Sequence, residues 1–380
     1  TMNGWAALPF TTADNLRQQG PEFLCLSQSE ICRVVTLDTS GTDGQPKRLY
    51  FTADEQESTV DFFAVGMSTL VDQGDRVLIL LPGERPGSVG ELLERALKKL
   101  GAVPIPHGPV QNLAKTLELL QVKAVDTLVG IPTQVLALAR YSLMGAEPVR
   151  LKSVLLSTDH AAEALVQAIE KSWQCQVFDH YGMTEMGLGG GVDCEAHAGY
   201  HLRDADLYFE VVDTVTGAPV QDGAEGEVVF TTLTRRGMPL IRYRTGDIAR
   251  FLPEPCSCGS GLMRLDYIRR RVDGPARLDA DCVLTLEELD EWLFALPGVI
   301  DFSAAVDSRS IPVRLSIRLL TLGEAAAARR QARQRLEMLP VLQGLQVNKG
   351  LTIDIQAVVC DGSLPAPAGK RKISKNGGSV

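Results

Sequence analysis

Residues 39–47, TSGTDGQPK, combine glycines, hydroxyl side chains and a lysine directly after the apolar run ICRVVTLD. Gly41 and Gly44 allow the backbone to approach an anion closely. The hydroxyl donors and the positive charge that complete such a site come from Thr39, Ser40, Thr42 and Lys47. The spacing differs from the GxxxxGK[ST] pattern of a Walker loop. The segment therefore predicts either a phosphate-binding loop or a solvated turn between a strand and a helix.

Residues 179–187, DHYGMTEMG, follow a second apolar run that is typical of a strand. Tyr181 offers a ring for stacking, and Gly182 permits a tight turn. Thr184 and Glu185 supply hard oxygen atoms, which Mg²⁺ prefers as ligands. The alternative is an ordinary strand exit that is followed by a helix cap.

Two further segments end in a charged residue after a glycine. In YRTGD, residues 243–247, the carboxylate of Asp247 is suited to accept hydrogen bonds from two ribose hydroxyls, although a hairpin turn explains the pattern equally well. In PAPAGK, residues 365–370, Lys370 ends a Pro/Gly loop that either presents a cation or forms a frayed basic tail.

Cysteine and histidine cluster in two segments, PCSCGSG and VDCEAHAGYH. A structural Zn²⁺ site needs four soft or imidazole ligands. We expect such a site from Cys194, His201, Cys256 and Cys258, with His197 as the reserve ligand. The alternative is three free thiols and surface histidines. The other cysteines are expected to be core thiols: Cys25, Cys32, Cys175, Cys282 and Cys360.

The composition limits the class of protein. The chain has 380 residues, of which 45% are hydrophobic, so a sizeable core is expected. The formal net charge of −9 argues against nucleic acid as a partner. The sequence shows neither a membrane span nor a secretory signal, and eight cysteines do not suggest a disulfide scaffold. We therefore expect a cytoplasmic enzyme that binds neither nucleic acid nor membrane.

The elements that must position these segments follow from the apolar pattern. Strand-like runs at 76–81, 126–131 and 153–158 alternate with helical patterns at 89–101, 133–144 and 160–173. This alternation predicts an α/β domain with a parallel sheet covered on both faces. Ligands of such sheets bind at the carboxyl ends of the strands.

The pattern changes twice towards the C-terminus. Between about residues 200 and 271, strands separated by turn signals predict a small antiparallel, barrel-like unit. From residue 272, the order helix, strand, strand, helix, strand predicts a small α+β domain. We therefore expect a large domain over residues 1–271 and a small one over residues 272–380.

Taken together and in this order, the motifs identify a resemblance. TSGTDGQPK, YGMTE, YRTGD, IRRRVDG and PAGK resemble the motifs of the adenylate-forming superfamily. The stretch GEVVFTTLTRRGMPLIRYRTGD followed by CSCG is similar to the phenylacetate–CoA ligase branch. The resemblance implies a nucleotide-binding large domain and a small C-terminal lid that rotates between two half-reactions.

The resemblance also implies roles for single residues. Residues 39–47 would cover the β- and γ-phosphates of ATP, Thr184 would contact the α-phosphate, and Glu185 would hold Mg²⁺. The nucleoside would lie against Ser157, Thr158, Asp159, Asp179, His180, Tyr181 and Gly182, with the ribose at Asp247 near Arg271. Asp273 would be the hinge, and Lys370 would bridge the acyl carboxylate and the α-phosphate.

The sequence departs from the family pattern at several positions. Asp43 replaces the usual second threonine of the phosphate loop, and Arg270 and Gly274 replace the usual residues around the hinge. Fewer residues precede the phosphate loop than in family members. The resemblance therefore supports adenylation more directly than thioester formation.

The reaction that the resemblance implies has two steps. An acid and ATP give acyl-AMP and pyrophosphate, and the acyl group then passes to CoA. An aryl or arylacetic acid is expected, in a pocket around residues 107–110, 130–133 and 186–189. The alternatives are transfer to a carrier protein or another acceptor, or a nucleotide-binding regulatory protein without turnover. The sequence leaves open whether the chain forms a homodimer.

Overall fold

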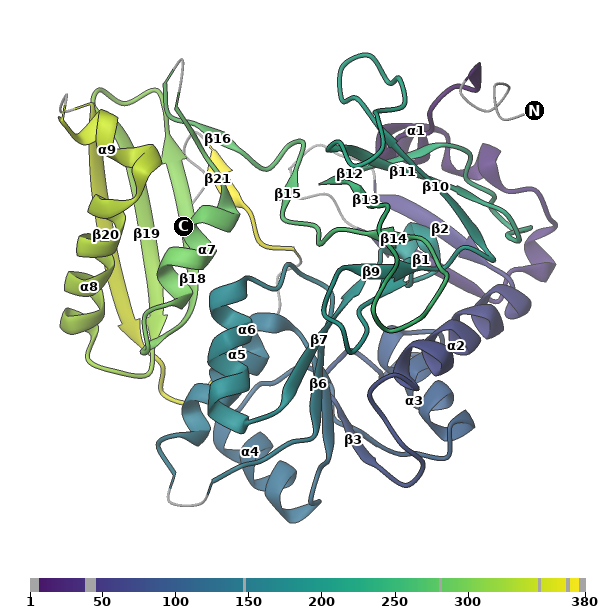
Figure 1. Ribbon diagram of the computed structural model, residues 1–380, viewed down its shortest axis with the longest axis horizontal. Coiled ribbons are helices and arrows are strands. Elements are labelled where there is room, and N and C mark those ends of the chain that lie inside the picture. Colours follow the sequence, from purple (N-terminus) through teal and green to yellow (C-terminus); the bar gives the residue numbers. More distant parts are fainter. Residues whose placement is uncertain are drawn as a thin grey trace. The chain divides into compact units, whose positions relative to one another are not determined.

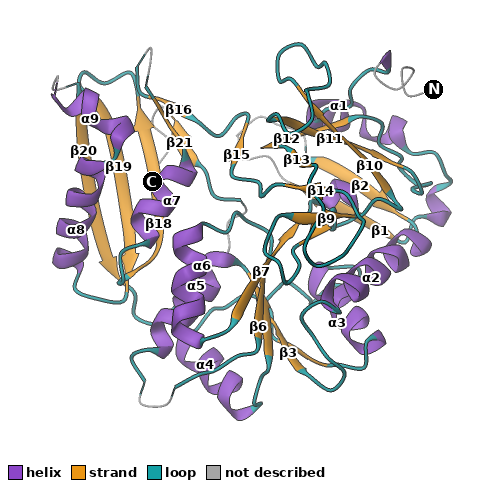
Figure 2. Ribbon diagram, in the orientation of Figure 1, coloured by secondary structure: helices purple, strands orange, loops and turns teal. Residues whose placement is uncertain are grey.

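The computed structural model describes residues 7–37, 46–145, 148–279, 282–347, 350–366 and 370–375. The chain divides into two compact units. Their helices and strands are labelled in Figures 1 and 2. Unit 1 comprises Thr1–Asp75, Pro82–Pro106 and Phe178–Ile268, and unit 2 comprises Arg76–Leu81, His107–Val177 and Arg269–Val380. The functional domain boundary at residues 271 and 272 stays a prediction.

Unit 1 is built mainly from antiparallel strands. One sheet has the order β10-β11-β12, and another run has the order β7-β8-β9-β14-β13. The strands are β1 (Arg33–Leu37), β2 (Lys47–Phe51), β4 (Val103–Pro106), β7 (Gln176–Tyr181), β8 (Gly191–Val192), β9 (Tyr200–Leu202), β10 (Leu207–Val212), β11 (Gly226–Thr232), β12 (Tyr243–Ala249), β13 (Phe251–Leu252) and β14 (Arg264–Leu265). The predicted antiparallel unit is therefore confirmed.

Two of the helices of unit 1, α1 (Ala13–Gln19) and α2 (Ala53–Met67), start at capping boxes. The unit also contains α3 (Val89–Lys99) and the short 3₁₀ turns η2 (Gly20–Phe23), η3 (Gln28–Glu30) and η4 (Thr184–Met186). Thr52 and Glu55 form a capping box at the start of α2, in which each side chain binds the other residue's backbone N–H. The capping box fixes α2 directly after β2, the strand that begins with Lys47.

Unit 2 contains the predicted parallel sheet. β3 (Arg76–Ile79), β5 (Thr127–Gly130) and β6 (Ser153–Leu156) pair in parallel, and every residue of β5 and β6 is buried. Burial on both faces is typical of a parallel sheet covered by helices. The helices of this part are α4 (Leu113–Val122), α5 (Pro132–Ser142) and α6 (Glu163–Trp173). The predicted α/β fold class is confirmed.

Helix α6 begins three residues later than the sequence pattern predicts. The pattern starts at His160, whereas the helix starts at Glu163 because Ala162 has an extended backbone and no capping side chain. The cap comes instead from Glu291, whose carboxylate accepts the N–H groups of Glu163 at 2.7 Å and Ala164 at 2.9 Å. A cap from so distant a residue cannot be read from the local sequence.

The C-terminal part of unit 2 is an α+β layer. It contains β15 (Arg270–Arg271), β16 (Ala276–Arg277), β17 (Val283–Leu284), α7 (Leu286–Phe294), β18 (Val299–Asp307), β19 (Val313–Thr321), α8 (Ala325–Met338), α9 (Pro340–Val347), β20 (Leu351–Val359) and β21 (Ile373–Lys375). The main sheet has the order β20-β19-β18-β21, and α8 and α9 contact β20 (Figure 1). The predicted order is confirmed, with β16, β17, α9 and β21 added.

No helix in the described ranges is long and apolar enough to cross a membrane.

Candidate active site

A buried ion pair lies at the centre of unit 1. Lys47 is the first residue of β2, Glu185 lies in the turn η4, and Tyr243 begins β12. The ammonium of Lys47 binds Oε1 of Glu185, and the hydroxyl of Tyr243 donates to the same oxygen at 2.9 Å. Lys47 also donates to the Tyr243 hydroxyl at 3.3 Å. Three segments that are distant in the sequence therefore meet at one carboxylate oxygen.

The surroundings of Glu185 keep its carboxyl group ionised. Its side chain is only 6% exposed, and this burial by itself raises its pKa. The charge of Lys47 and the hydrogen bonds from Lys47 and Tyr243 outweigh the burial, so the pKa of Glu185 lies below its usual value. Arg235 fixes the backbone as well, because its guanidinium donates to the Glu185 carbonyl oxygen at 2.7 Å. Glu185 therefore presents a preformed anion, which suits a divalent cation.

A second group in unit 1 orients two predicted nucleotide residues. The Tyr181 hydroxyl donates to Oδ2 of Asp247 at 3.1 Å, and the Asp247 residue is only 2% exposed. The Tyr181 ring stacks on Tyr200, with centroids 5.6 Å apart, and the Tyr200 hydroxyl donates to Oδ2 of Asp179 at 2.6 Å. Both carboxylates are thus held by tyrosine hydroxyls.

The residues close to Tyr181 in the sequence make contacts that mainly support the fold. The His180 ring packs against Phe62 and Phe63, and burial lowers its pKa to about 4, so the imidazole is neutral at physiological pH. A Cβ atom on Gly182 would lie 2.5 Å from the Leu188 carbonyl oxygen, so this position accepts only glycine. Thr184 begins the turn η4, and its carbonyl oxygen accepts the N–H of Gly187 at 3.0 Å.

Most of the predicted phosphate loop cannot be placed. Thr39, Ser40, Gly41, Thr42 and Gly44 lie outside the residues that the structure describes. Lys47 is the one predicted residue of this loop within the described ranges, and it lies in the buried ion pair.

The remaining predicted residues belong to unit 2. Ser157, Thr158 and Asp159 directly follow β6, where Ser157 donates its N–H to the Gly130 carbonyl oxygen at 3.0 Å. Asp159 accepts the N–H of Arg371 at 3.3 Å. Arg271 forms an ion pair with Asp273 at 3.4 Å, and Lys370 is exposed. The two units therefore hold separate parts of the predicted site.

Tyr243, Arg235 and Arg371 make site contacts that the sequence analysis did not assign. Tyr243 opens the motif YRTGD, and its position three residues ahead of Gly246 was the available signal. Arg235 lies in a turn, TTLTRRGMPL, without a distinguishing pattern. Arg371 follows Lys370, in a segment for which a basic tail was the alternative interpretation.

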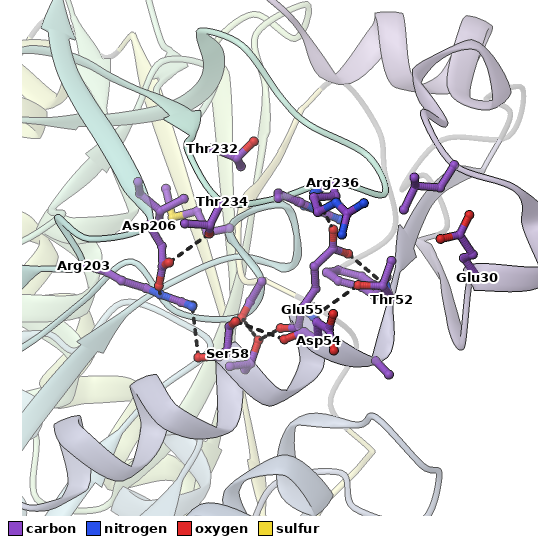
Figure 3. Close-up of a pocket in the computed structure, with 18 residues that line it drawn as sticks. Glu30, Thr52, Asp54, Glu55, Ser58, Arg203, Asp206, Thr232, Thr234 and Arg236 are labelled. Atoms are coloured by element: carbon purple, nitrogen blue, oxygen red, sulfur yellow. Dashed lines mark hydrogen bonds and ion pairs between the residues drawn. The ribbon is translucent and has the colours of Figure 1, made fainter.

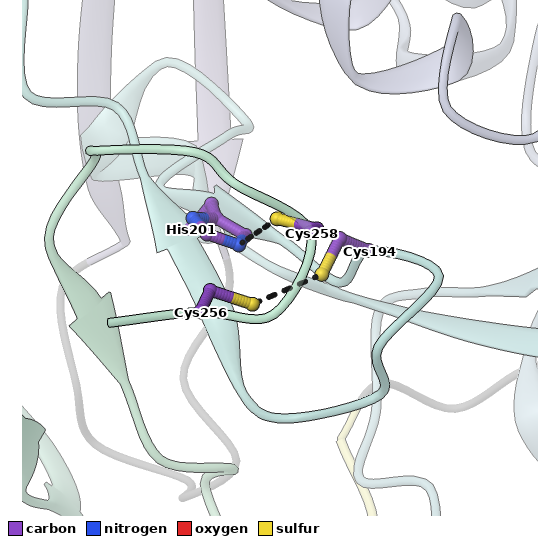
Figure 4. A group of neighbouring side chains, drawn as sticks. All are labelled: Cys194, His201, Cys256 and Cys258. Carbon is purple, nitrogen blue, oxygen red and sulfur yellow. Dashed lines mark hydrogen bonds between the residues drawn. The ribbon is translucent and has the colours of Figure 1, made fainter. Parts of the chain in front are cut away.

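The predicted zinc ligands come together in unit 1 (Figure 4). One ligand atom from each of Cys194, His201, Cys256 and Cys258 lies within 4.8 Å of the others. The sulfur atoms of Cys194 and Cys256 are 3.7 Å apart, and the Cys258 sulfur is 3.3 Å from Nε2 of His201. Sulfur ligands at ~2.3 Å from a tetrahedral Zn²⁺ lie ~3.8 Å apart, so the donors fit this ion.

The structure shows which of the two candidate histidines lies with the thiols. Nδ1 of His197 lies 2.7 Å from Oδ2 of Asp193, and its ring packs against Phe178 at 4.9 Å. His201 lies at the three thiols instead, and burial lowers its pKa, which favours the neutral ligand form. His201 is therefore the imidazole that the fold brings to this cluster.

A separate cleft of about 300 Å³ lies in unit 1 beside the start of α2 (Figure 3). Several of its charged side chains have partners within the unit. Glu55 accepts the N–H groups of Arg236 and Gly237, and Arg203 pairs with Asp206 at 2.6 Å. Met186 and Gly187, which belong to a segment predicted to line the acyl pocket, also line this cleft.

Comparisons with known proteins identify relatives. The chain is 32% identical to a phenylacetate–coenzyme A ligase of Aromatoleum evansii over 65% of this chain and 57% of that protein. It is 26% identical to the phenylacetate–coenzyme A ligase of Escherichia coli (strain K12) over 95% of this chain and 83% of that protein. The chain thus spans less than two thirds of the length of some curated relatives, including one of Pseudomonas putida at 57%.

Solved structures support the fold. A 2-hydroxyisobutyryl-CoA ligase in the postadenylation state, in complex with R3-HIB-AMP, matches with a TM-score of 0.80 and 21% identity over 98% of this chain and 80% of that chain. The same ligase in complex with 2-HIB-AMP and CoA matches with a TM-score of 0.66 over 98% of this chain and 80% of that chain. Residues 34–233, more than half of the chain, match the family of AMP-binding enzymes. With its phenylacetate–CoA ligase relatives, the chain therefore belongs to the AMP-binding enzymes of the adenylate-forming superfamily.

Proposed function

We propose that this chain activates a carboxylic acid with ATP and transfers the acyl group to CoA. The observation that carries the proposal is the buried carboxylate of Glu185, held ionised by Lys47 and Tyr243. The curated relatives named phenylacetate–CoA ligases, and the related ligase that holds an acyl-AMP and CoA, support the same reaction class.

In the proposed first step, the carboxylate of the acid attacks the α-phosphorus of ATP. A bond forms between the two, the bond to the bridging oxygen breaks, and pyrophosphate leaves. Glu185 would hold Mg²⁺, which neutralises charge on the phosphate oxygens when bound. Lys47 would face the phosphates, and Thr184 the α-phosphate. The substrate itself is the nucleophile, so positioning and charge stabilisation are the main tasks of the protein.

The nucleoside and the second step complete the proposal. Asp247, oriented by Tyr181, would bind the ribose hydroxyls, and Asp179 would face the adenine. Lys370 would meet the acyl carboxylate during adenylation, and a C-terminal lid over residues 272–380 would rotate before thioester formation. The thiol of CoA would then attack the acyl carbon, releasing AMP and a proton. Arg271, Ser157 and Thr158 are proposed nucleotide contacts.

The substrate class follows from the relatives. We propose an aryl or arylacetic acid, because the curated relatives are named for phenylacetate. A cytoplasmic location and a homodimer stay predictions; light scattering on the purified protein tests the second.

A pyrophosphate-release screen over carboxylic acids tests the function, with and without CoA and with mass analysis of the product. Acid-dependent pyrophosphate release and an acyl-CoA product are expected. Release without a thioester would identify another acceptor, such as a carrier protein, and overturn the CoA step. Nucleotide binding without release for any acid would favour the regulatory alternative.

We also propose that Cys194, His201, Cys256 and Cys258 hold a structural Zn²⁺. Three of the four residues are buried, and the donors come from two segments of unit 1 that are about sixty residues apart. A closed set of four protein ligands leaves no position for substrate, so the role would be to cross-link these segments.

Elemental analysis tests the zinc site. About one zinc per chain is expected, and a chelator should lower the melting temperature because the segments lose their cross-link. Cys256→Ser should lose the metal, whereas Cys25→Ser should keep it. Cys25 and Cys32 are exposed, and Cys175, Cys282 and Cys360 are only partly buried, so the prediction of these five as core thiols is wrong. A metal-free protein in which all three thiols titrate freely would defeat the proposal.

A further inference from the structure

Arg371, the residue directly after Lys370, has a nearly buried side chain in unit 2. The side chain is 15% exposed, and its Nη1 atom donates to Oδ1 of Asp290 at 2.7 Å. Its Nε atom lies 3.5 Å from Oδ1 of Asp301. Asp290 belongs to α7 and Asp301 to β18, so one guanidinium joins two elements.

Two aromatic rings enclose the same guanidinium. Its central carbon lies 4.9 Å from the centroid of Phe294 and 4.5 Å from that of Phe302. Planar guanidinium groups stack well on aromatic faces, whereas the compact, strongly hydrated ammonium of lysine does so less well. The site therefore selects both the charge and the shape of arginine.

The backbone of Arg371 is also held. Its N–H donates to Oδ2 of Asp159, in the loop after β6, at 3.3 Å. Two residues later, Ile373 starts β21, which pairs in parallel with β18. Residues 371–375 are thus held by contacts within unit 2. The frayed-tail alternative concerns residues 365–370, of which residues 367–369 lie outside the described ranges.

The cluster contains more negative than positive charge. Arg371 is the cation among Asp159, Asp290 and Asp301, and Asp290 is fully buried. Burial raises the pKa of Asp290 to about 7, although the charge of Arg371 acts in the opposite direction. Removing one partner from such a buried cluster is costly, because it leaves an uncompensated buried charge.

We propose that Arg371 is a positioning residue that holds Lys370 in place for acyl-AMP formation. This inference rests on the proposed role of Lys370. Consecutive Cα atoms are ~3.8 Å apart, so a fixed residue 371 confines the base of the Lys370 side chain. Confinement lowers the entropy lost when the ammonium meets the charge that develops between the acid and the α-phosphate.

Asp159 ties this anchor to the predicted large domain. It lies before the predicted boundary at residue 272, whereas Arg371, Asp290 and Asp301 lie after it. If the small domain rotates as proposed, the bond between Asp159 and the Arg371 N–H breaks, and the pairs with Asp290 and Asp301 remain. Arg371 would then support adenylation and not thioester formation.

The test compares Arg371→Met and Arg371→Lys with a matched control, Lys372→Met, at the exposed next residue. Arg371→Met keeps an unbranched apolar stem beside the rings but removes the guanidinium. It should slow acyl-AMP formation about 10- to 100-fold in kcat, with KM for ATP and acid changed less than about threefold. Thioester formation from supplied acyl-AMP and CoA should stay near normal. Arg371→Lys should recover part of the rate, and Lys372→Met should match the wild type.

Removing Arg371 leaves buried carboxylates without their cation, so Arg371→Met alone could unfold the protein. The double variant Asp290→Asn with Arg371→Met removes the fully buried charge and should regain thermal stability. Acyl-AMP formation should stay slow in this variant, because the guanidinium that fixes residue 371 is still absent. Recovery of the rate together with stability would show that Arg371 acts only on stability and would overturn the proposal.

Amide hydrogen exchange gives a readout that does not depend on activity. In Arg371→Met, the peptide containing residues 371–375 should lose protection at least about tenfold, while the β19 and α6 peptides keep theirs. Unchanged protection, or wild-type acyl-AMP formation by Arg371→Met, overturns the inference alone. If the wild-type protein forms no acyl-AMP from any acid tested, the proposed function is overturned. The hydrogen-exchange result would still decide whether Arg371 anchors this segment.

Discussion

Two buried ionic clusters, the Lys47–Glu185 pair of unit 1 and the Arg371 cluster of unit 2, differ in their balance of charge. In unit 1, one lysine meets one glutamate, and a tyrosine hydroxyl supports the same oxygen. In unit 2, one arginine serves three aspartates. This difference in charge balance changes the pKa values of the carboxyl groups. The pKa of Glu185 is lowered, whereas that of Asp290 is raised to about 7.

Burial acts in the same direction on both carboxyl groups, so the difference comes from the partners. Among the described residues Lys47 pairs with no second carboxylate, and its attraction together with the hydrogen bonds to Glu185 exceeds the cost of burial there. Arg371 is divided among its neighbours, and its attraction does not offset the complete burial of Asp290. The first cluster is suited to keep an anion ready for a cation, and the second to respond to pH.

The largest expected effect is that of Glu185→Gln in the first cluster, where one lysine pairs with one glutamate. The amide is uncharged and a poor Mg²⁺ ligand, so acyl-AMP formation should fall roughly a thousandfold or more. Pyrophosphate release at varied Mg²⁺ concentration measures this. Glu22→Gln, at an exposed residue, is the control and should match the wild type. Normal turnover in Glu185→Gln would remove the metal role assigned to this carboxylate.

Lys370→Ala tests the residue that the second cluster is proposed to support. Acyl-AMP formation should fall about a hundredfold, because an ammonium that meets charge mainly in the transition state is lost. Thioester formation from supplied acyl-AMP and CoA should continue at close to the normal rate. Lys372→Ala is the neighbouring control. Equal losses in both half-reactions would mean that Lys370 acts through binding or stability.

Lys47→Met tests whether charge balance stabilises the first cluster. It leaves the Glu185 carboxylate buried without its cation, so the pKa of Glu185 should rise and the free energy of unfolding should fall by ~3–5 kcal/mol. Chemical denaturation near neutral pH measures this. Arg48→Met, at the exposed next residue of β2, should change the free energy of unfolding by less than ~0.5 kcal/mol.

A double variant sharpens this test. Lys47→Met with Glu185→Gln removes both charges and should recover most of the lost stability, because no unpaired ion stays buried. If the single variant is as stable as the wild type, the carboxyl group accepts a proton at little cost, and the two clusters differ less than the structure indicates.

Much of the first cluster could be predicted from the sequence, and little of the second. Lys47 and Glu185 belong to motifs whose residue types indicate phosphate and metal binding. The parallel strands of the sheet could be predicted as well, because they are continuous apolar runs in the sequence. The direct pairing of Lys47 with Glu185 was not predicted, because nothing in the local sequence shows that β2 and η4 are neighbours. Asp159 was predicted at a strand end, but its bond to the Arg371 N–H was not.

One signal for the second cluster was present in the sequence. In LTLEELDEWLF, the apolar positions 286, 289, 293 and 294 form one helical stripe, and Asp290 lies on it. A carboxylate on an apolar stripe is buried and needs a partner. The partner could not be named, because Arg371 is 81 residues away and the local sequence does not show which basic residue lies next to α7 in the fold.

The expected effect that is smallest per step of the titration is on the pH dependence of stability, and it tests the cluster around Arg371 directly. The folded protein binds a proton on Asp290 up to about pH 7, whereas the unfolded chain releases it near the ordinary value of 3.8. Between these values the folded state holds more protons than the unfolded state, so the free energy of unfolding falls as pH rises. One proton accounts for at most ~1.4 kcal/mol per pH unit.

Asp290→Asn should therefore flatten the decline in stability between about pH 4 and 7, as chemical denaturation at several pH values would measure. The decline should not vanish, because other groups face the cluster from α7, β18, the loop after β6 and the C-terminal segment: Glu287, Asp301, Asp159, Lys370 and Arg371. Burial also raises the pKa of Glu287, Asp301 and Asp159. Asp222→Asn, in an exposed turn, is the control and should follow the wild-type curve. An unchanged slope in Asp290→Asn would show that Arg371 keeps Asp290 ionised after all, and the contrast between the two clusters would then disappear.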